Sequence, residues 1–386
     1  MTETNPAPRL LELHIEGFKS IKNQTIVLQP LTVLIGANGA GKSNLVGFLA
    51  MLSRMLTGGL QEWVKSQAGA NNILHFGANR TPVLNAKIQF ETGKGRNFYE
   101  FSLKANNELG LFVDREVVGF QKTGTENFFQ VPLDSNLGWE SKLSGIRKAS
   151  PFPGLTPVQQ KTCAVIATLL RECQAYQFHD TTPFSKIRTP SGDHLNRFLH
   201  AHGGNLPTWL HRLGHTHPDN LAFIERTIGE VFPDFGGFIL EVDPVTHSIP
   251  LLWKHRATGE IFAAHHLSDG TIRFIALCSL LLQPIELMPD IVLIDEPELG
   301  LHPTALQILA AMAQSAVAQG KQVIMTTQSP SFLSCFTPKD VVVVESENGC
   351  SVFRSMKDRE EDLAQWLEKF EKLGTLWEMN ILGGQP

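Results

Sequence analysis

The segment 36–43, GANGAGKS, constrains the fold of this chain more than any other part of it. Residues 31–35 (LTVLI) before it have the apolar character of a buried strand, and residues 44–56 after it have helical character. Between a strand and a helix, the backbone N–H groups of such a loop wrap phosphate oxygens, and the helix N-terminus adds the positive end of its dipole. Lys42 can neutralise the terminal phosphates, and the Ser43 hydroxyl can bind Mg²⁺. The alternative, a chance glycine-rich turn, does not explain the flanking strand and helix.

Residues 291–296, IVLIDE, supply the acidic groups that this loop lacks. Four consecutive aliphatic residues predict a strand buried on both faces of a parallel sheet, and ligands of such sheets bind at the carboxyl ends of the strands. Asp295 is therefore expected to hold a metal ion, directly or through water, and Glu296 to orient and deprotonate an attacking water. A solvated turn is the alternative, but the strand before the acids and Pro297 after them favour a site.

Composition is that of a large enzyme without a membrane segment. The 386 residues are 42% hydrophobic, carry a net charge of −5 and include five cysteines without a CxxC pattern. The charge gives no general attraction to nucleic acid, and such cysteines favour reduced thiols inside a cell. The N-terminus has no apolar signal core, and polar residues and a proline interrupt the most apolar stretch, 274–288, leaving it too short to span a bilayer. We expect a cytoplasmic protein with no membrane partner.

Strand and helix patterns predict an α/β fold in three parts. Residues 1–145 form an N-terminal lobe, residues 146–237 a mainly helical insertion or lid, and residues 238–386 a C-terminal lobe that ends in a helix. Alternating segments of the first lobe predict an antiparallel meander with strands at 86–90, 97–103 and 111–120. The helices of the insertion are expected at 157–177, 192–213 and 220–231.

Residues 267–271, LSDGT, stand directly before a long apolar helix. Ser268 is then expected at the N-cap, with the backbone amides of Asp269 and Gly270 at the helix N-terminus, an arrangement suited to gripping a phosphate. An ordinary serine N-cap is the alternative. The position of the pentamer ahead of IVLIDEPELGLHP disfavours it.

With these motifs the sequence resembles the ATP-binding-cassette (ABC) superfamily, whose signature motif LSGGQ precedes the Walker B strand. The resemblance implies an α/β P-loop NTPase of ABC-ATPase type, with a mixed, largely parallel core sheet, an antiparallel β lobe and a helical insertion. It also implies a homodimer that sandwiches ATP, in which Ser268 and Gly270 of one subunit act on the ATP held by Lys42 of the other. Residues 298–303 (ELGLHP) resemble the family's D-loop, which crosses the dimer seam.

Within that superfamily the chain is more similar to the SMC, RecF and OLD-type ATPases than to transporter subunits. The shared features are FKSI at 18–21, GANGAGKSN, LSDGT followed by Arg273, IDEPELGLHP, and TTQSP at 326–330. In such enzymes the residues around GFKS flank the adenine and ribose, which makes Phe18 and Lys19 candidates for that contact. The middle of the chain shows no sustained heptad, so a compact helical lid is expected where SMC proteins carry a coiled coil.

The motifs and the resemblance together define one set of site residues, with ATP and Mg²⁺ as cofactors. The catalytic candidates are Glu296, Lys42, Gln328 and Ser268, and the metal candidates are Ser43 and Asp295. The nucleotide-binding candidates are Gly36, Ala37, Asn38, Gly39, Ala40, Gly41, Lys42, Ser43, Asn44, Phe18, Lys19, Ser268, Asp269 and Gly270.

Two features depart from the family pattern. Family members commonly place a histidine against the γ-phosphate after the strand that follows Walker B, and here the corresponding residue is Gln328. A glutamine amide donates a hydrogen bond but carries no imidazolium charge, so we predict slow turnover. The glutamine of the Q-loop is not evident, and Gln89 is the candidate for it.

The insertion also holds six histidines between 194 and 217. Surface or partner contacts are favoured for them over a zinc site, because no cysteine or carboxylate joins them at a ligand spacing.

The resemblance implies a Mg²⁺-ATP-dependent, homodimerising ATPase that regulates an effector or DNA, in anti-phage defence or DNA repair. OLD nucleases carry a C-terminal Toprim nuclease domain, and this sequence shows no separate acidic cluster for one. We therefore expect the effector on a separate polypeptide. It would be a nuclease or a toxin, and a Toprim-like nuclease is one candidate. Two alternatives stay open. One is the nucleotide-binding subunit of an ABC transporter, which the insertion disfavours, and the other is a nucleotide-dependent binding module without significant turnover, which the intact Lys42, Asp295 and Glu296 disfavour.

Overall fold

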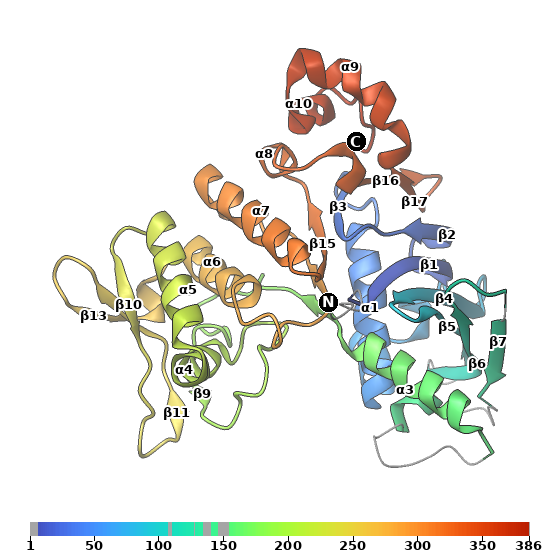
Figure 1. The fold of residues 1–386 in the computed structure, drawn as a ribbon, viewed down its shortest axis with the longest axis horizontal. Helices are drawn as coiled ribbons and strands as arrows, with labels where there is room; N and C mark the ends of the chain where they lie inside the picture. Colours follow the sequence, from blue (N-terminus) through green and yellow to red (C-terminus); the bar gives the residue numbers. More distant parts are fainter. Residues whose placement is uncertain (1–6, 107–109, 127, 134–139, 146–153, 386) are drawn as a thin grey trace.

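The computed structural model of the chain describes residues 7–106, 110–126, 128–133, 140–145 and 154–385, and its main element is a six-stranded mixed sheet, the core sheet (Figure 1). In spatial order the strands are β17 (Cys350–Ser355), β16 (Val341–Glu347), β3 (Leu31–Ile35), β15 (Gln322–Thr327), β14 (Ile291–Ile294) and β8 (Cys173–Tyr176). The strands from β16 to β8 run parallel, and β17 pairs antiparallel with β16 at one edge. The mixed, largely parallel core sheet expected from the sequence is confirmed.

The core sheet is covered on both faces, which is why its central strands are unbroken apolar runs in the sequence. All residues of β3, β14 and β15 are buried. Successive side chains of a strand point to opposite faces. Val33 and Ile35 accordingly belong to one apolar cluster and Leu34 to the other.

A second six-stranded sheet, the antiparallel lobe, packs over the helix that follows the phosphate loop. Its strands in order are β2 (Ile21–Val27), β1 (Arg9–Phe18), β4 (Val83–Thr92), β5 (Gly95–Ala105), β6 (Leu111–Lys122) and β7 (Phe128–Pro132). Phe48 of α1 (Lys42–Thr57) stacks on Phe101 of β5 and shares an apolar cluster with Leu34 of the core sheet. α1 therefore lies between the two sheets. The predicted meander is confirmed as β4 to β6.

A further lobe, the insertion lobe, lies on the other side of β15 from the antiparallel lobe (Figure 1). It contains α4 (Leu206–Thr216), α5 (Pro218–Val231), α6 (Asp269–Leu281) and a sheet of β10 (Phe235–Ile239), β12 (Leu252–His255) and β13 (Ile261–Ala263). The two-residue strands β9 (Ser191–Gly192) and β11 (Ser248–Ile249) pair beside α4. The remaining helices are α2 (Leu60–Ser66), α3 (Pro157–Arg171), α7 (Pro303–Ala318), α8 (Pro330–Leu333), α9 (Glu360–Phe370) and α10 (Leu373–Glu378). Short 3₁₀ helices lie at Ala70–Asn72, Lys142–Gly145, Ala264–His266, Pro338–Asp340 and Lys357–Arg359.

The range 146–237 differs from the expected helical lid in two places. The helix expected at 157–177 ends at Arg171, and the next residues form β8, which gains backbone hydrogen bonds at the open edge of β14. The helix expected at 192–213 begins only at Leu206, because Gly203 before it has a left-handed φ of 70° that no helix includes. Division of the chain at 145 and 237 stays a prediction, but α3 packs on α1 and β8 belongs to the core sheet.

The C-terminal segment folds back onto the chain. After α9, the side chains of Trp377 and Leu382 are buried, and the Gly384 N–H donates a hydrogen bond to Glu345 Oε1 at 2.9 Å. Nowhere in the described parts of the chain is a helix long and apolar enough to cross a membrane.

Candidate active site

The loop 36–43 joins β3 to α1, as the sequence predicts, and two of its glycines have no room for a side chain. A Cβ on Gly36 would lie 2.1 Å from the Val344 carbonyl oxygen, and one on Gly41 would lie 1.9 Å from Ser351 Oγ. Both residues also have a positive φ, 152° and 114°, that L-residues rarely adopt. The opposite face of the loop is open, because Asn38, Gly39 and Ser43 are exposed while Ala40 is buried beneath them.

Lys42 is the first residue of α1, and its side chain turns back to the start of the loop. Its Nζ donates hydrogen bonds to the carbonyl oxygens of Gly36 and Ala37 at 2.6 and 3.0 Å. Burial lowers the pKa of Lys42, while neighbouring carboxylates, of which Glu296 is the strongest influence, act in the opposite direction. Because β3 and β14 both pair in parallel with β15, the phosphate loop and the acids that follow β14 lie at the same edge of the core sheet.

Asp295 is held in one orientation by side chains from the strands on either side of β14. Thr326 Oγ1 of β15 donates to Asp295 Oδ1 at 2.6 Å, and Gln177 Nε2, one residue after β8, donates to Oδ2 at 3.0 Å. His179 Nε2 lies 2.9 Å from the Asp295 main-chain oxygen. A buried carboxylate with both oxygens fixed in this way is suited to a metal ion or its water shell.

Gln177 is the glutamine that sequence reasoning missed. The candidate for that role, Gln89, was wrong: it lies in β4 of the antiparallel lobe, opposite Glu12 of β1. The short segment CQAY precedes Gln177, but it carries no aliphatic run and continues the pattern of α3, so the pattern predicts a helix where the structure has β8. Only the pairing of β8 with β14 brings Gln177 to Asp295.

Glu296 and Gln328 meet at the carboxyl ends of β14 and β15. Gln328 Nε2 donates a hydrogen bond to Glu296 Oε1, so the residue in the position of the expected histidine contacts the proposed base directly. Glu296 has a left-handed φ of 42°, which for a residue with a side chain is a strained conformation of the kind that clusters at active sites.

Glu298 is a third acid at this edge of the sheet and is 9% exposed. Its Oε1 accepts hydrogen bonds from Thr327 Oγ1 at 2.6 Å and from the Gln328 N–H at 2.8 Å, which fixes the turn that carries Gln328. Its Oε2 is buried and has no hydrogen-bond partner among the described residues. Burial raises the pKa of Glu298.

Ser268 caps α6, as the sequence predicts. Its Oγ accepts a hydrogen bond from the Thr271 N–H at 3.0 Å, and the residue is exposed. Asp269 pairs with Arg188, whose Nη2 lies 2.8 Å from Asp269 Oδ1, and hydrogen bonds from Arg188 and Thr181 lower the pKa of Asp269. The buried Arg188 side chain also donates to the carbonyl oxygens of Thr181 and Leu267, so it holds the LSDGT turn against the segment after β8. Sequence reasoning did not single out Arg188, which no motif marks.

Gly270 and Arg273 connect the signature helix to the D-loop segment. A Cβ on Gly270 would lie 2.1 Å from the Gly300 carbonyl oxygen, so the two backbones touch. Arg273 is 7% exposed; its Nη1 donates to the Leu299 carbonyl oxygen and its Nε to that of Phe178 at 3.0 Å. One side chain therefore joins α6, the D-loop segment and the segment that carries Gln177.

Phe18 does not lie where the resemblance placed it. Its side chain is fully buried and meets Phe48 edge-on, with ring centroids 5.5 Å apart, because β1 ends in the apolar core under α1. Lys19 Nζ turns to Gln67 Oε1 at 3.1 Å, and burial lowers the pKa of Lys19. The contact expected of the Phe18 ring with a nucleotide is not available in this structure.

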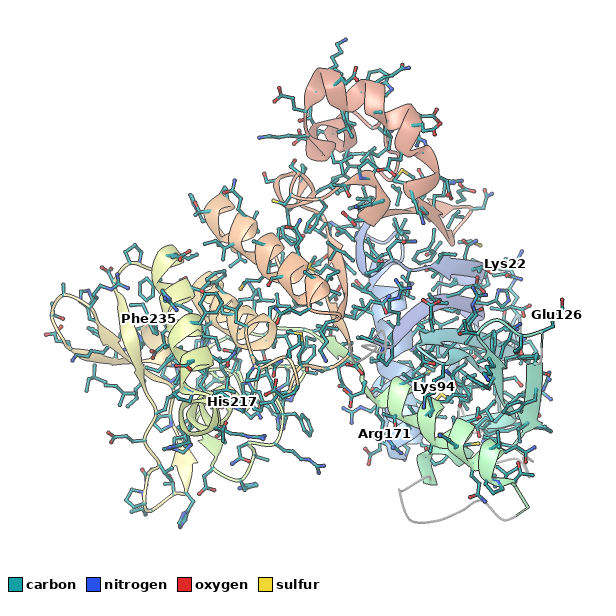
Figure 2. The ribbon with its side chains drawn as sticks, in the orientation of Figure 1. Lys22, Lys94, Glu126, Arg171, His217 and Phe235 are labelled. Carbon is teal, nitrogen blue, oxygen red and sulfur yellow. The ribbon has the colours of Figure 1, made fainter. Side chains whose placement is uncertain are left out.

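The phosphate loop and the signature helix of one chain stand in different lobes. α1 lies beside the antiparallel lobe and α6 in the insertion lobe, with β15 between them (Figure 1). Figure 2 shows how the two lobes lie, with Lys22 and Lys94 of the antiparallel lobe and Arg171 at the end of α3 on one side, and His217 and Phe235 of the insertion lobe on the other. Of the expected site residues, the structure thus brings Lys42, Asp295, Glu296 and Gln328 to one edge of the core sheet. The LSDGT residues lie at the N-terminus of α6, where Asp269 pairs with Arg188 and Gly270 meets Gly300.

The histidines of the insertion form pairs rather than a larger cluster. His211 and His215 lie one turn apart on α4 with their Nε2 atoms 3.1 Å from each other. Within the described ranges, no three or more histidine, cysteine, aspartate or glutamate side chains are grouped to hold a metal ion.

Two family models match separate parts of the chain. Residues 12–150 match a family described as "AAA domain", and residues 179–334 match one described as "AAA domain, putative AbiEii toxin, Type IV TA system". The first range contains the phosphate loop, and the second contains the LSDGT turn and the acids after β14. The chain is also 20% identical to the Old nuclease of Escherichia phage P2 over 92% of its own length, and it spans 62% of that relative.

Solved structures with a similar fold are SMC head domains. One is an SMC head bound to the C-winged helix domain of ScpA, with a TM-score of 0.52, 14% identity, and 91% of this chain and 99% of that chain covered. Another is the SMC head with an extended coiled coil bound to the C-terminal domain of ScpA from Pyrococcus furiosus, with a TM-score of 0.53, 14% identity, and 95% and 100% covered. At this identity the likeness concerns the fold alone.

Proposed function

Because the chain belongs to the AAA ATPases of the ABC, SMC and OLD-like type, we propose that it binds Mg²⁺-ATP and hydrolyses it slowly as a head-to-tail homodimer. The observation that carries the proposal is the separation of its two phosphate-binding elements. Lys42 and the acids stand at one site, while the exposed N-terminus of α6 stands in another lobe (Figure 1). A second copy of the chain would bring its Ser268 and Gly270 onto the ATP held by the first.

The side chains at the site have the chemistry that this reaction needs. Lys42 and the exposed N–H groups of the phosphate loop would bind the triphosphate. The donor set of the Ser43 hydroxyl and the Asp295 carboxylate fits Mg²⁺, which when bound supplies charge neutralisation for the phosphates. Glu296 would take the proton of the attacking water, and the Gln328 amide, already hydrogen-bonded to Glu296, would donate to the γ-phosphate.

A mixing experiment tests whether the sites are shared between subunits. Lys42→Ala removes the phosphate-loop lysine, and Ser268→Arg blocks the signature turn, so each variant alone is expected to be inactive. A mixed dimer has one intact site, built from Lys42 of one chain and Ser268 of the other, and one site with both changes. An equimolar mixture should therefore recover about a quarter of the wild-type ATPase rate, because half of the dimers are mixed and each has one working site.

The controls of this experiment separate activity from assembly. Glu296→Gln should retain ATP and accumulate as a dimer in sedimentation velocity, since the base is lost while every phosphate contact remains. A wild-type chain that stays monomeric with a non-hydrolysable ATP analogue, together with no recovery of activity on mixing, would refute the shared site.

We further propose that the ATP state of this dimer controls either a separate effector protein, which is a nuclease or a toxin, or the binding of the dimer to DNA. The setting would be anti-phage defence or DNA repair. The similarity to Old nuclease and to a family described by a toxin system supports this choice. Pull-down of the native complex from its own cells, with Glu296→Gln as bait against Lys42→Ala, tests it. An effector of this kind should be enriched on the ATP-retaining variant, and equal recovery on both variants would contradict ATP control.

A further inference from the structure

Phe184 is the most exposed large apolar side chain among the described residues, at 93%. It lies in the loop 181–188, which follows β8 and precedes β9, and Pro183 beside it is exposed as well. Burial of such a ring against a partner removes its apolar surface from water and is favourable. Single exposed apolar residues are common on protein surfaces, and what distinguishes this one is how its loop is held.

Hydrogen bonds and one apolar anchor hold the loop 181–188 in a fixed shape. The Ser185 hydroxyl and N–H both donate to the Thr182 carbonyl oxygen, at 2.7 and 2.9 Å. The Ile187 side chain is buried in an apolar cluster. A ring on a loop that is already ordered loses little conformational entropy when a partner covers it.

Both ends of the loop 181–188 are fastened to Asp269 of the LSDGT turn. Arg188 Nη2 lies 2.8 Å from Asp269 Oδ1, and the Thr181 side chain is also hydrogen-bonded to that carboxylate. Arg188 Nε donates to the Thr181 carbonyl oxygen at 2.7 Å and so closes the base of the loop. Asp269 stands where the signature LSGGQ has a glycine, which has no side chain to hold a loop. The loop is therefore built onto the signature turn.

Phe184 stands close to the N-terminus of α6. Three residues of extended chain span at most about 11 Å, which limits the distance from the Cα of Phe184 to that of Thr181. The proposed function places Ser268, which precedes Asp269, on the ATP held by a second copy. A stable interface covers roughly 800 Å² on each partner, a patch about 30 Å across. A dimer interface of that size has room for both Ser268 and Phe184.

We propose that Phe184 is a dimer-interface residue, exposed in the single chain and buried by a second copy of the chain when ATP closes the head-to-tail dimer. The inference rests on the proposed function, because it needs the LSDGT turn to face a second copy. The loop that carries the ring is fastened to that same turn. Another protein covering the ring would therefore compete with closure of the dimer.

Two further segments border the phosphate loop and form the surface that receives the ring in the second copy. The turn 17–22 touches its end, since Asn44 Nδ2 donates to Ser20 Oγ at 2.6 Å. The β16–β17 hairpin, residues 346–351, touches it through Ser351 Oγ, which donates to a carbonyl oxygen of the phosphate loop at 2.5 Å. The ring contacts this surface because the LSDGT turn approaches the phosphates that it surrounds.

Sedimentation velocity of the full chain tests the proposal in the Glu296→Gln background, the parent, which the proposed function expects to hold ATP as a dimer. Each dimer buries two Phe184 side chains and each contributes about tenfold, so Phe184→Ala should raise the Kd of the ATP-loaded dimer about a hundredfold. Phe184→Leu, which stays apolar, should raise it less. Without nucleotide the Tm should equal that of the parent. The matched control is Phe223→Ala on α5, whose ring is also exposed and whose loss should leave the Kd unchanged.

Photo-crosslinking identifies what covers the ring. With p-benzoylphenylalanine at position 184, the parent should form a crosslink between two copies only when Mg²⁺-ATP is present. The captured peptide should contain residues from 17–22, 36–44 or 346–351. The same group at position 223 should give no crosslink between copies.

The outcomes distinguish this proposal from the proposed function. If the parent dimerises with ATP while Phe184→Ala keeps its Kd, or if the crosslink reaches any other segment, Phe184 lies outside the interface and the proposed function stands. Equal weakening of the dimer by Phe184→Ala and Phe223→Ala would also overturn the role of Phe184. If the parent never dimerises with ATP, the proposed function itself fails and this interface fails with it.

Discussion

Gln177 donates a hydrogen bond to Asp295, with 3.0 Å between Gln177 Nε2 and Asp295 Oδ2. The contact exists because β8 and β14 run parallel with Tyr176 opposite Ile294, so the residues after the two strands emerge side by side. Thr326 of β15 holds the other oxygen of the same carboxylate. The orientation of the expected metal ligand is therefore set from both of its neighbouring strands.

Gln177→Leu is expected to impair the use of Mg²⁺. Loss of a hydrogen bond to a charged group costs about 1.5–3 kcal/mol, and here it frees one oxygen of Asp295 to rotate. We expect the Mg²⁺ concentration for half-maximal ATPase activity to rise about tenfold. The control is Gln89→Leu in the antiparallel lobe, which should behave as wild type. Equal Mg²⁺ dependence of the two variants would contradict a role for Gln177.

Arg273→Met should destabilise the fold and uncouple the three segments that this side chain joins. Removal of the guanidinium leaves the buried carbonyl oxygen of Phe178 and that of Leu299 without their donor, at a cost of about 1–3 kcal/mol for each group left unpaired. Urea unfolding should show a lower free energy of unfolding than wild type by about 2 kcal/mol or more. Arg226→Met on the exposed face of α5 is the control and should change it by less than about 0.5 kcal/mol.

Gly270→Ala should separate the signature turn from the D-loop segment. The added methyl group would lie 2.1 Å from the Gly300 carbonyl oxygen, so one of the two backbones must move. We expect an ATPase rate at least about tenfold lower and a loss of about 1–3 kcal/mol of stability. Gly47→Ala is the opposite control, because its Cβ would have only Lys19 Nζ at 3.7 Å and alanine favours the interior of α1 by up to about 1 kcal/mol. Wild-type activity of Gly270→Ala would show that the two segments need not touch.

Glu298→Gln should change how stability depends on pH. Burial raises the pKa of Glu298 above its ordinary value of 4.5, so the unfolded chain releases this proton at a lower pH than the folded chain does. Wild-type stability therefore falls as pH rises above 4.5 until the folded chain also ionises. The variant cannot titrate and keeps an acceptor for Thr327, so its free energy of unfolding relative to wild type should increase as the pH rises above 4.5. The free energy of unfolding is measured by urea titration at several pH values. A difference between the variant and wild type that stays constant with pH would contradict the raised pKa.

Local pattern was enough to predict the core of the site. The loop that ends at Lys42 follows the buried aliphatic strand β3, and Asp295 and Glu296 follow β14 directly. Parallel strands bring the segments that follow them to one edge of a sheet. The Ser268 N-cap could also be predicted, because serine is one of the residues preferred at the position directly before a helix.

Tertiary pairing decided what the sequence did not reveal. CQAY continues the amphipathic pattern of α3 and becomes a strand only because the edge of β14 is open to it. Phe18 and Phe76 are both phenylalanines beside glycines, and only the fold places the first in the core and the second at the surface. Arg188 carries no motif, since its role depends on carbonyl oxygens that lie about 80 residues further along the chain.

Gln328→His should raise the rate of the chemical step. In wild type the Gln328 amide donates to Glu296, and an imidazole at the same place can donate as well and also carry a positive charge towards the γ-phosphate. Because a histidine is charged mainly below its ordinary pKa of about 6.5, the gain in the single-turnover rate should be larger at about pH 6 than at about pH 8. Quench-flow with limiting ATP measures this rate without product release, and Gln314→His on the exposed face of α7 is the control. A wild-type rate already typical of fast ATPases, or a gain that is the same at both pH values, would mean that the missing imidazolium charge does not limit the proposed reaction.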